Sequence, residues 1–147
     1  MFFNGNDVQQ FQTQKDFIDT ALVPLLFLEF DDARIRQSSS ATDFLMSLTA
    51  FVEQQFKGRL MLVPPFSYTN QTKDGLAVNL LKEELQSTGF KYVIFITTDH
   101  TWTSHSEQLD VIWLPPIPLE SMDKGVKKTV LEEQLKQIIP VLTSKWY

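Results

Sequence analysis

The segment from 92 to 97 constrains the fold more than any other part of the sequence. It reads YVIFIT, an unbroken run of aromatic and β-branched residues without a charge. A strand with one face in water alternates apolar and polar side chains, so a continuous run is typical of a strand covered on both faces. We therefore predict that 92–97 lies inside a sheet, with parallel neighbours on both sides and helices over both faces.

Three other apolar runs have the length of strands. They lie at 22–30, 60–63 and 111–114, and the last two each end at a pair of prolines. The first run contains Pro24, which has no N–H to donate to a strand ladder, so we expect this strand to begin near Leu25. The polar stretch 66–73 that follows the second run is predicted to be a loop.

Segments with helical periodicity separate these runs. An apolar stripe from Phe44 to Phe56 predicts a helix ending at Gly58, with possible caps at Ser38, Ser39, Ser40 and Thr42. A helix carrying Leu76, Leu80, Leu81 and Leu85 should close at Gly89, and the last helix should bend or end early at Pro140. Near the N-terminus, Val8, Phe11, Lys15 and Ile18 recur at helical spacing and predict a short helix, in which the Lys15 stem covers apolar surface.

Strands that alternate with helices pair in parallel through right-handed crossovers. We therefore predict a single α/β domain over 1–147, a three-layer sandwich with a mostly parallel sheet of about four strands, flavodoxin-like or Rossmann-like. A chain of 147 residues is long enough to bury a continuous core without disulfides, and it contains no cysteine. This length and composition agree with one soluble domain.

Charge and composition narrow the classes of partner. With 13 Lys and Arg against 18 Asp and Glu, the net charge is −5, which disfavours nucleic acid and anionic lipid as partners. No basic residue precedes Lys15, so no signal peptide is visible, and the longest apolar run, 21–28, is far short of the ~20 residues that span a membrane. We expect a cytoplasmic protein that does not insert into membranes.

Three short segments resemble a known family. They are QFKGR at 55–59, LVPPFSY at 62–68 and WLPPIPLE at 113–120, and the similarity extends over nearly the whole chain. These segments resemble the uncharacterised YpiF-like proteins of Gram-positive spore-forming bacteria. The resemblance implies a cytoplasmic protein of unknown function, and it assigns no role to any residue.

Polar and aromatic residues follow the predicted strands. Because the carboxyl ends of parallel strands share one edge of a sheet, where ligands bind in folds of this class, we expect these loops to converge. In particular, Asp31, Tyr68, Asp99 and His100 should come within one site. The candidate residues are Asp31, Asp32 and Arg34 after the first strand, Tyr68 after the second, and Thr98, Asp99, His100, Trp102 and His105 after the third.

Two interpretations of this cluster remain open. Carboxylates beside a histidine suit acid–base catalysis or metal binding, whereas the simpler interpretation is that Asp31 and Asp99 cap turns and both histidines are solvated. His100 and His105 lack the third ligand that a zinc site needs, so we predict no metal site. The serines at 38–40 resemble a phosphate-binding loop, but without glycine they fit helix capping better.

Familiar catalytic and nucleotide-binding motifs do not occur. The sequence has no G-x-x-x-x-G-K-[ST], G-x-G-x-x-G or G-x-S-x-G, and we predict no cofactor. Our leading hypothesis is a non-catalytic binding or assembly module that uses its strand-exit loops, with Tyr68 and Trp102, to contact an unknown protein partner or small molecule. The alternative is an enzyme or small-ligand-binding protein in which Asp31, Asp99 and His100 act on a polar or phosphorylated substrate.

Overall fold

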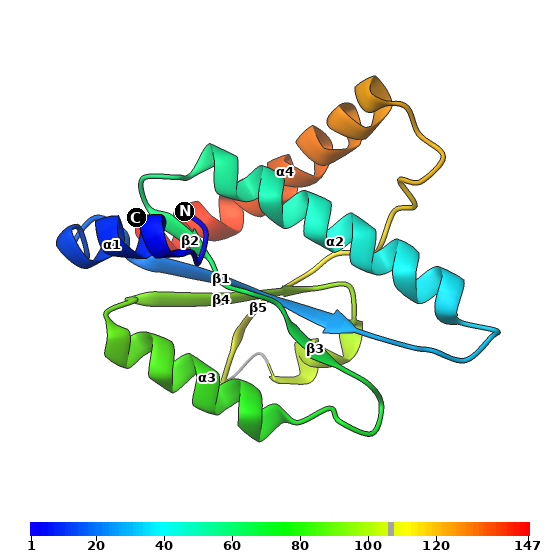
Figure 1. Cartoon of the computed structure of the whole chain (residues 1–147), viewed down its shortest axis with the longest axis horizontal. Coiled ribbons are helices and arrows are strands. Elements are labelled where there is room, and N and C mark those ends of the chain that lie inside the picture. Colours follow the sequence, from blue (N-terminus) through cyan, green and yellow to red (C-terminus); the bar gives the residue numbers. More distant parts are fainter. Residues whose placement is uncertain (106–107) are drawn as a thin grey trace.

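The computed structural model describes residues 1–105 and 108–147, and its helices and strands alternate along the chain (Figure 1). Within these residues, no helix combines the length and apolar character needed to cross a membrane. The elements, in chain order, are α1 (Gly5–Thr13), β1 (Thr20–Phe27), α2 (Ile35–Gln55), β2 (Leu60–Leu62), β3 (Phe66–Tyr68), α3 (Gly75–Thr88), β4 (Tyr92–Thr97), the 3₁₀ helix η1 (His100–His105), β5 (Asp110–Trp113) and α4 (Lys124–Trp146).

The sheet of the described residues has five strands, and all its pairs are parallel. The strand order is β2-β1-β4-β5, and β3 continues the pairing of β2 along the same side of β1. β4 lies between β1 and β5, which confirms the prediction for 92–97. Residues 66–68 form β3, so the expectation of an entirely irregular loop at 66–73 was wrong.

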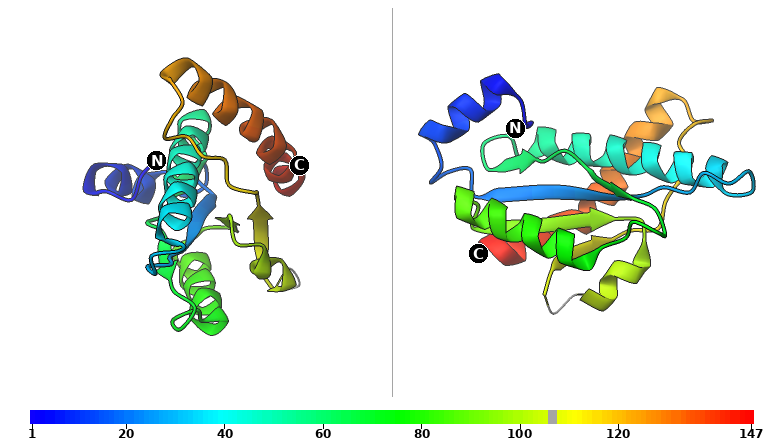
Figure 2. Two further views of the ribbon diagram at one scale, coloured as in Figure 1. Left: turned by 90° about the vertical axis from the view of Figure 1, so that its right-hand side faces the viewer. Right: turned by 60° about the horizontal axis from the view of Figure 1, so that its bottom comes forward.

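Successive side chains of β4 point to opposite faces and divide the core in two. Val93 and Phe95 belong to the cluster beneath α1, α3 and η1, whereas Ile94 and Ile96 belong to the cluster beneath α2 and α4. Figures 1 and 2 show α2 and α4 on one side of the sheet and α3 with η1 on the other. The predicted three-layer α/β fold is confirmed, and continuous hydrophobicity in β4 is explained because both of its faces are buried.

The prediction that the first strand begins near Leu25 was wrong, because β1 includes Pro24 in its middle. Leu22 O accepts from Val63 N at 2.9 Å and Leu28 N donates to Tyr68 O at 2.8 Å, so the backbone groups at 22 and 28 face β2 and β3. Backbone direction alternates along a strand, and Pro24 therefore faces the same side. Its missing N–H falls at the gap between β2 and β3, where the ladder requires no donor.

Helix α2 begins earlier than the stripe of apolar residues suggested. Ser38, Ser39 and Ser40 lie inside the helix, and its N-cap, Arg34, makes no side-chain cap hydrogen bond. The prediction that Ser38, Ser39, Ser40 or Thr42 caps this helix was therefore wrong, because Thr42 also lies inside it. Ser38 instead ties the helix to the β1 exit, because its Oγ accepts from Glu29 N at 2.9 Å and donates to Phe27 O at 3.2 Å.

The ends of the other three major helices agree only in part with the positions predicted from glycine, proline and apolar spacing. α3 ends at Gly89 as predicted, and the φ of 124° at this residue explains the glycine. α4 continues through Pro140 to Trp146, so the proline does not end the helix. α1 ends at Thr13, and Ile18, which was expected on the helix, is buried beyond it.

Candidate functional site

The exits of β3 and β4 meet in a buried hydrogen-bonded network. The Tyr68 hydroxyl donates to Asp99 Oδ2 at 2.6 Å and accepts from Trp102 Nε1 at 2.5 Å. The Tyr68 and Trp102 rings pack edge to face with centroids 5.5 Å apart, and these residues are only 2% and 0% exposed. Their burial leaves neither aromatic side chain a surface with which to contact a partner.

Asp99 has further partners besides Tyr68. Its Oδ1 accepts from the Thr101 backbone N–H at 3.1 Å and from the Thr101 hydroxyl at 2.7 Å. The Lys73 ammonium lies 3.8 Å from Asp99 Oδ2 and 4.7 Å from the centroid of the Trp102 ring, and it also donates to the Thr101 hydroxyl. We call Tyr68, Lys73, Asp99, Thr101 and Trp102 the exit network.

The two acidic groups of the exit network have pKa values displaced in opposite directions. Burial acts to raise the pKa of Asp99, but hydrogen bonds from Tyr68 and Thr101, with the charge of Lys73, outweigh it and hold this pKa below its usual range. Burial and the hydrogen bond to the Asp99 carboxylate raise the pKa of Tyr68. Asp99 is thus ionised and Tyr68 protonated at neutral pH, which suits a structural pair better than proton transfer.

Asp31 and His100 lie outside the exit network. Asp31 is exposed, with an oxygen 3.7 Å from Arg34 Nη1, and His100 is exposed beside the Trp113 ring, with centroids 6.3 Å apart. Among the described residues, neither side chain makes a hydrogen bond or ion pair with Tyr68 or Asp99. Of the four residues expected to converge, Tyr68 and Asp99 are the pair that forms a hydrogen bond among the described residues.

The remaining candidate residues are exposed or have local structural contacts. Asp32 and Arg34 are exposed in the β1–α2 connection, and the Thr98 carbonyl accepts from Trp113 Nε1 at 3.2 Å. The His105 ring lies beside Trp102, with centroids 5.3 Å apart, and against the first residue of α3. In the described part of the chain, no three His, Asp or Glu side chains gather in a way that could hold a metal ion.

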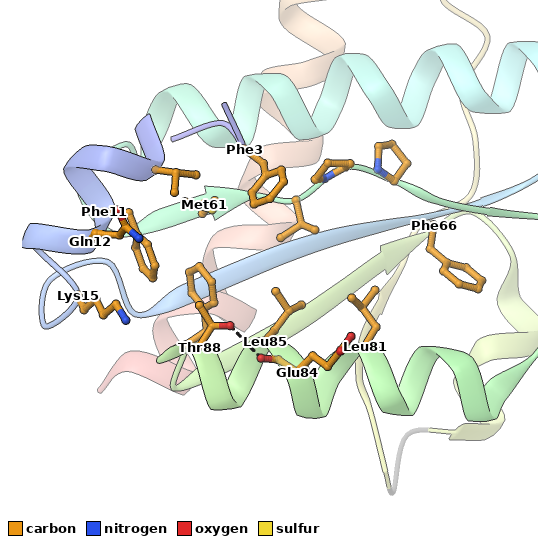
Figure 3. A pocket seen from close by; sticks show the side chains of 15 residues that line it. Phe3, Phe11, Gln12, Lys15, Met61, Phe66, Leu81, Glu84, Leu85 and Thr88 are labelled. Atoms are coloured by element: carbon orange, nitrogen blue, oxygen red, sulfur yellow. Dashed lines mark hydrogen bonds between the residues drawn. The ribbon is translucent and has the colours of Figure 1, made fainter. Parts of the chain in front are cut away.

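The sequence interpretation missed an apolar groove between α1 and α3, which we call the α1–α3 groove (Figure 3). Its volume is about 490 Å³. At one end the rings of Phe11 and Phe90 stack with centroids 4.8 Å apart. The residues that line it are Phe3, Val8, Phe11, Gln12, Lys15, Met61, Val63, Pro64, Pro65, Phe66, Leu81, Glu84, Leu85, Thr88 and Phe90.

Only part of this groove had a signal in the sequence. Leu81 and Leu85 belong to the predicted stripe of α3, and Pro64, Pro65 and Phe66 form a conspicuously apolar connection after a strand. Their meeting with the N-terminal helix depends on where α1 packs, which no local pattern specifies. Leu76 and Leu80, which also belong to the predicted helix, are 68% and 51% exposed and do not line the groove.

Comparison with known proteins confirms the resemblance stated above. The chain is 31% identical over 143 residues to the "Uncharacterized protein YpiF" of Bacillus subtilis (strain 168), covering 95% of this chain and 94% of that protein. No solved structure matches this chain. The model of the family described as "Protein of unknown function (DUF2487)" matches residues 9–146, and the chain therefore belongs to this family.

Proposed function

We propose that this protein is a non-catalytic binding module and that the α1–α3 groove receives an apolar ligand. The observation that carries the proposal is the groove itself, a concave surface of about 490 Å³ lined mainly by apolar side chains. Sites for small molecules and cofactors commonly have volumes of ~300–1,000 Å³ and are mostly apolar with a few polar groups. The α1–α3 groove has both properties.

The exit network supports a binding role over catalysis. Tyr68 and Asp99, whose pKa values are displaced in opposite directions, are hydrogen-bonded to each other, and the Tyr68 hydroxyl also accepts from the buried Trp102 Nε1. A catalytic acid or base needs a pKa near the working pH and access to its substrate. The candidate enzyme residues Asp31 and His100 do not join this pair, so the geometry favours a structural role for the exit network.

The lining of the groove is accessible to a ligand. Phe3 is 62% exposed at the groove, and Leu81 and Leu85 are only partly buried although they pack against the core. Apolar surface of this kind gains free energy, roughly 25 cal/mol per Å², when a ligand covers it. Because the chain has a net charge of −5, we place nucleic acid outside the expected ligands.

Binding of the neutral fluorescent dye Nile red tests the proposal. Leu81→Gln places an amide in the groove, whereas Leu80→Gln makes the same substitution one position away, at a side chain that does not line the groove. We expect Leu81→Gln to weaken dye binding by roughly fivefold, the effect of losing part of one leucine contact, and Leu80→Gln to leave it unchanged.

Urea unfolding of both variants shows whether each remains folded under the conditions of the binding assay. A native protein that binds no dye, or equal losses in the two variants, would show that the groove is not a binding site. Phe3→Ser, at the opposite wall, provides a second groove variant with little effect expected on the core.

A further inference from the structure

Lys15 occupies the α1 end of the groove. It lies in the connection between α1 and β1, and its ammonium is 5.8 Å from the centroid of Phe11, the ring that stacks on Phe90. Its stem runs beside the C-cap of α3, because a Cβ built at Gly89 would be 3.5 Å from Lys15 Cδ. These contacts hold a positive charge beside the stacked Phe11 and Phe90 rings at one end of the groove.

Among the described residues, no carboxylate forms an ion pair with Lys15. The other charged residue of the groove is Glu84, on α3. Figure 3 shows Lys15 near Phe11 and Glu84 farther along α3, without contact between their charged ends. The groove therefore has a positive end and an apolar interior that extends past Glu84 toward Phe66.

We propose that the ligand of the α1–α3 groove is a single-chain carboxylate amphiphile of the fatty-acid type, with its carboxylate on Lys15. The net charge of −5 disfavours binding to an anionic lipid surface, but Lys15 supplies a local positive charge where one carboxylate would lie. This inference rests on the binding function proposed above and names the ligand class. The neutral chain lies along Leu81 and Leu85 and ends toward Phe66, which keeps the anionic group away from Glu84. A volume of about 490 Å³ is in the lower part of the range for small-molecule sites and suits one chain better than two.

Displacement of bound Nile red by two competitors shows whether the carboxylate charge contributes to binding beyond the apolar chain. Decanoate and decanol have the same chain length and differ in charge, and both are used below the concentrations at which they aggregate. We expect decanoate to displace the dye at a concentration roughly threefold to fivefold lower than decanol, which is the advantage that a partly exposed ion pair supports. Lys15→Met should remove this preference by weakening decanoate binding alone.

Two further variants test the placement of the charge. Lys57→Met removes a lysine that does not line the groove, and it should leave the preference for decanoate intact. Glu84→Gln removes the nearby negative charge and should strengthen decanoate binding by roughly twofold, with no effect on decanol.

Each alternative result has a definite meaning. Equal displacement by decanoate and decanol would overturn the carboxylate assignment and leave the apolar groove, and tighter binding of decyltrimethylammonium would instead assign the polar end to Glu84. Nile red binding that neither decanoate nor decanol displaces would overturn the amphiphile proposal alone. Failure of the native protein to bind Nile red would remove the groove function, and this inference with it.

Discussion

Replacing Tyr68 by phenylalanine removes a single oxygen that links two buried or partly buried partners. Trp102 Nε1 would lose its acceptor, and an unsatisfied buried donor costs about 1–3 kcal/mol. Asp99 would lose one donor, and a hydrogen bond to a charged group contributes about 1.5–3 kcal/mol, although Thr101 still donates to the other carboxylate oxygen. We expect Tyr68→Phe to lower the free energy of unfolding by about 2–4 kcal/mol.

Urea unfolding at neutral pH measures this loss, and Tyr92→Phe is the matched control. Tyr92 is half-buried at the start of β4, and its hydroxyl makes no hydrogen bond to any described residue. The control should change the free energy of unfolding by less than about 0.5 kcal/mol. Equal small effects of Tyr68→Phe and Tyr92→Phe would refute the reasoning, because the exit network would then contribute nothing measurable.

A double-mutant cycle separates the two bonds of the Tyr68 hydroxyl. In a Trp102→Phe background the indole N–H is absent, so adding Tyr68→Phe no longer leaves a buried donor without an acceptor. We expect the cost of Tyr68→Phe to fall by about 1 kcal/mol or more in that background. Additive effects of the two substitutions would contradict a direct bond between these side chains.

The exit network should also appear in the pH dependence of stability. The folded-state pKa of Asp99 is lowered, so its contribution is fully present above the ordinary pKa of about 3.9 and is lost as the pH falls through the folded-state value. Asp99→Asn should therefore flatten the decline in the free energy of unfolding below about pH 4. An acid limb of unchanged slope in the variant would show that another carboxylate is responsible.

Three substitutions elsewhere test the fold, each by urea unfolding. Gly89→Ala should destabilise by about 1–2 kcal/mol because φ is 124° there, and a neutral effect would contradict that backbone conformation. Pro140→Ala restores an N–H within α4 and should stabilise by about 1–2 kcal/mol; a loss would mean that the proline shapes the helix favourably. Trp146→Ala removes a hydrogen bond to Thr20 Oγ1 and the ring that lies 4.3 Å from the Arg59 guanidinium. We expect the free energy of unfolding to fall by about 2 kcal/mol, and an unchanged value would indicate that the end of α4 is frayed.

The strand β4 could be predicted because burial of both its faces requires a continuous run of apolar residues in the sequence. Ile94 and Phe95 face opposite layers, and both are fully buried, so neither position tolerates a polar residue. The start of β1 could not be predicted by the same logic. β1 tolerates Pro24 because this residue faces the gap between β2 and β3, which pair with the same side of β1. The position of that gap depends on the assembled sheet and has no local sequence signal.

The sequence could predict which loops form the candidate site, but it could not predict which side chains of those loops interact. Topology brings the exits of β3 and β4 together, and Tyr68 and Asp99 do meet. It does not determine whether a side chain turns into the core or into solvent after the strand ends. Tyr68 and Trp102 turn into the core and Asp31 turns into solvent beside Arg34, and no local pattern in the sequence specifies these directions.

The groove follows from unequal helix lengths on the two faces of the sheet. α2 and α4 have 21 and 23 residues, so at 1.5 Å per residue they extend about 32 and 35 Å across one face. On the other face α1 and α3 have 9 and 14 residues and extend only about 14 and 21 Å. The shorter pair leaves apolar side chains of the β2–β3 connection partly exposed, among them Pro64 and Pro65, above the buried Met61 and Val63. A groove of this origin is part of the architecture, so a ligand that fills it completes the layer that the two short helices leave unfinished.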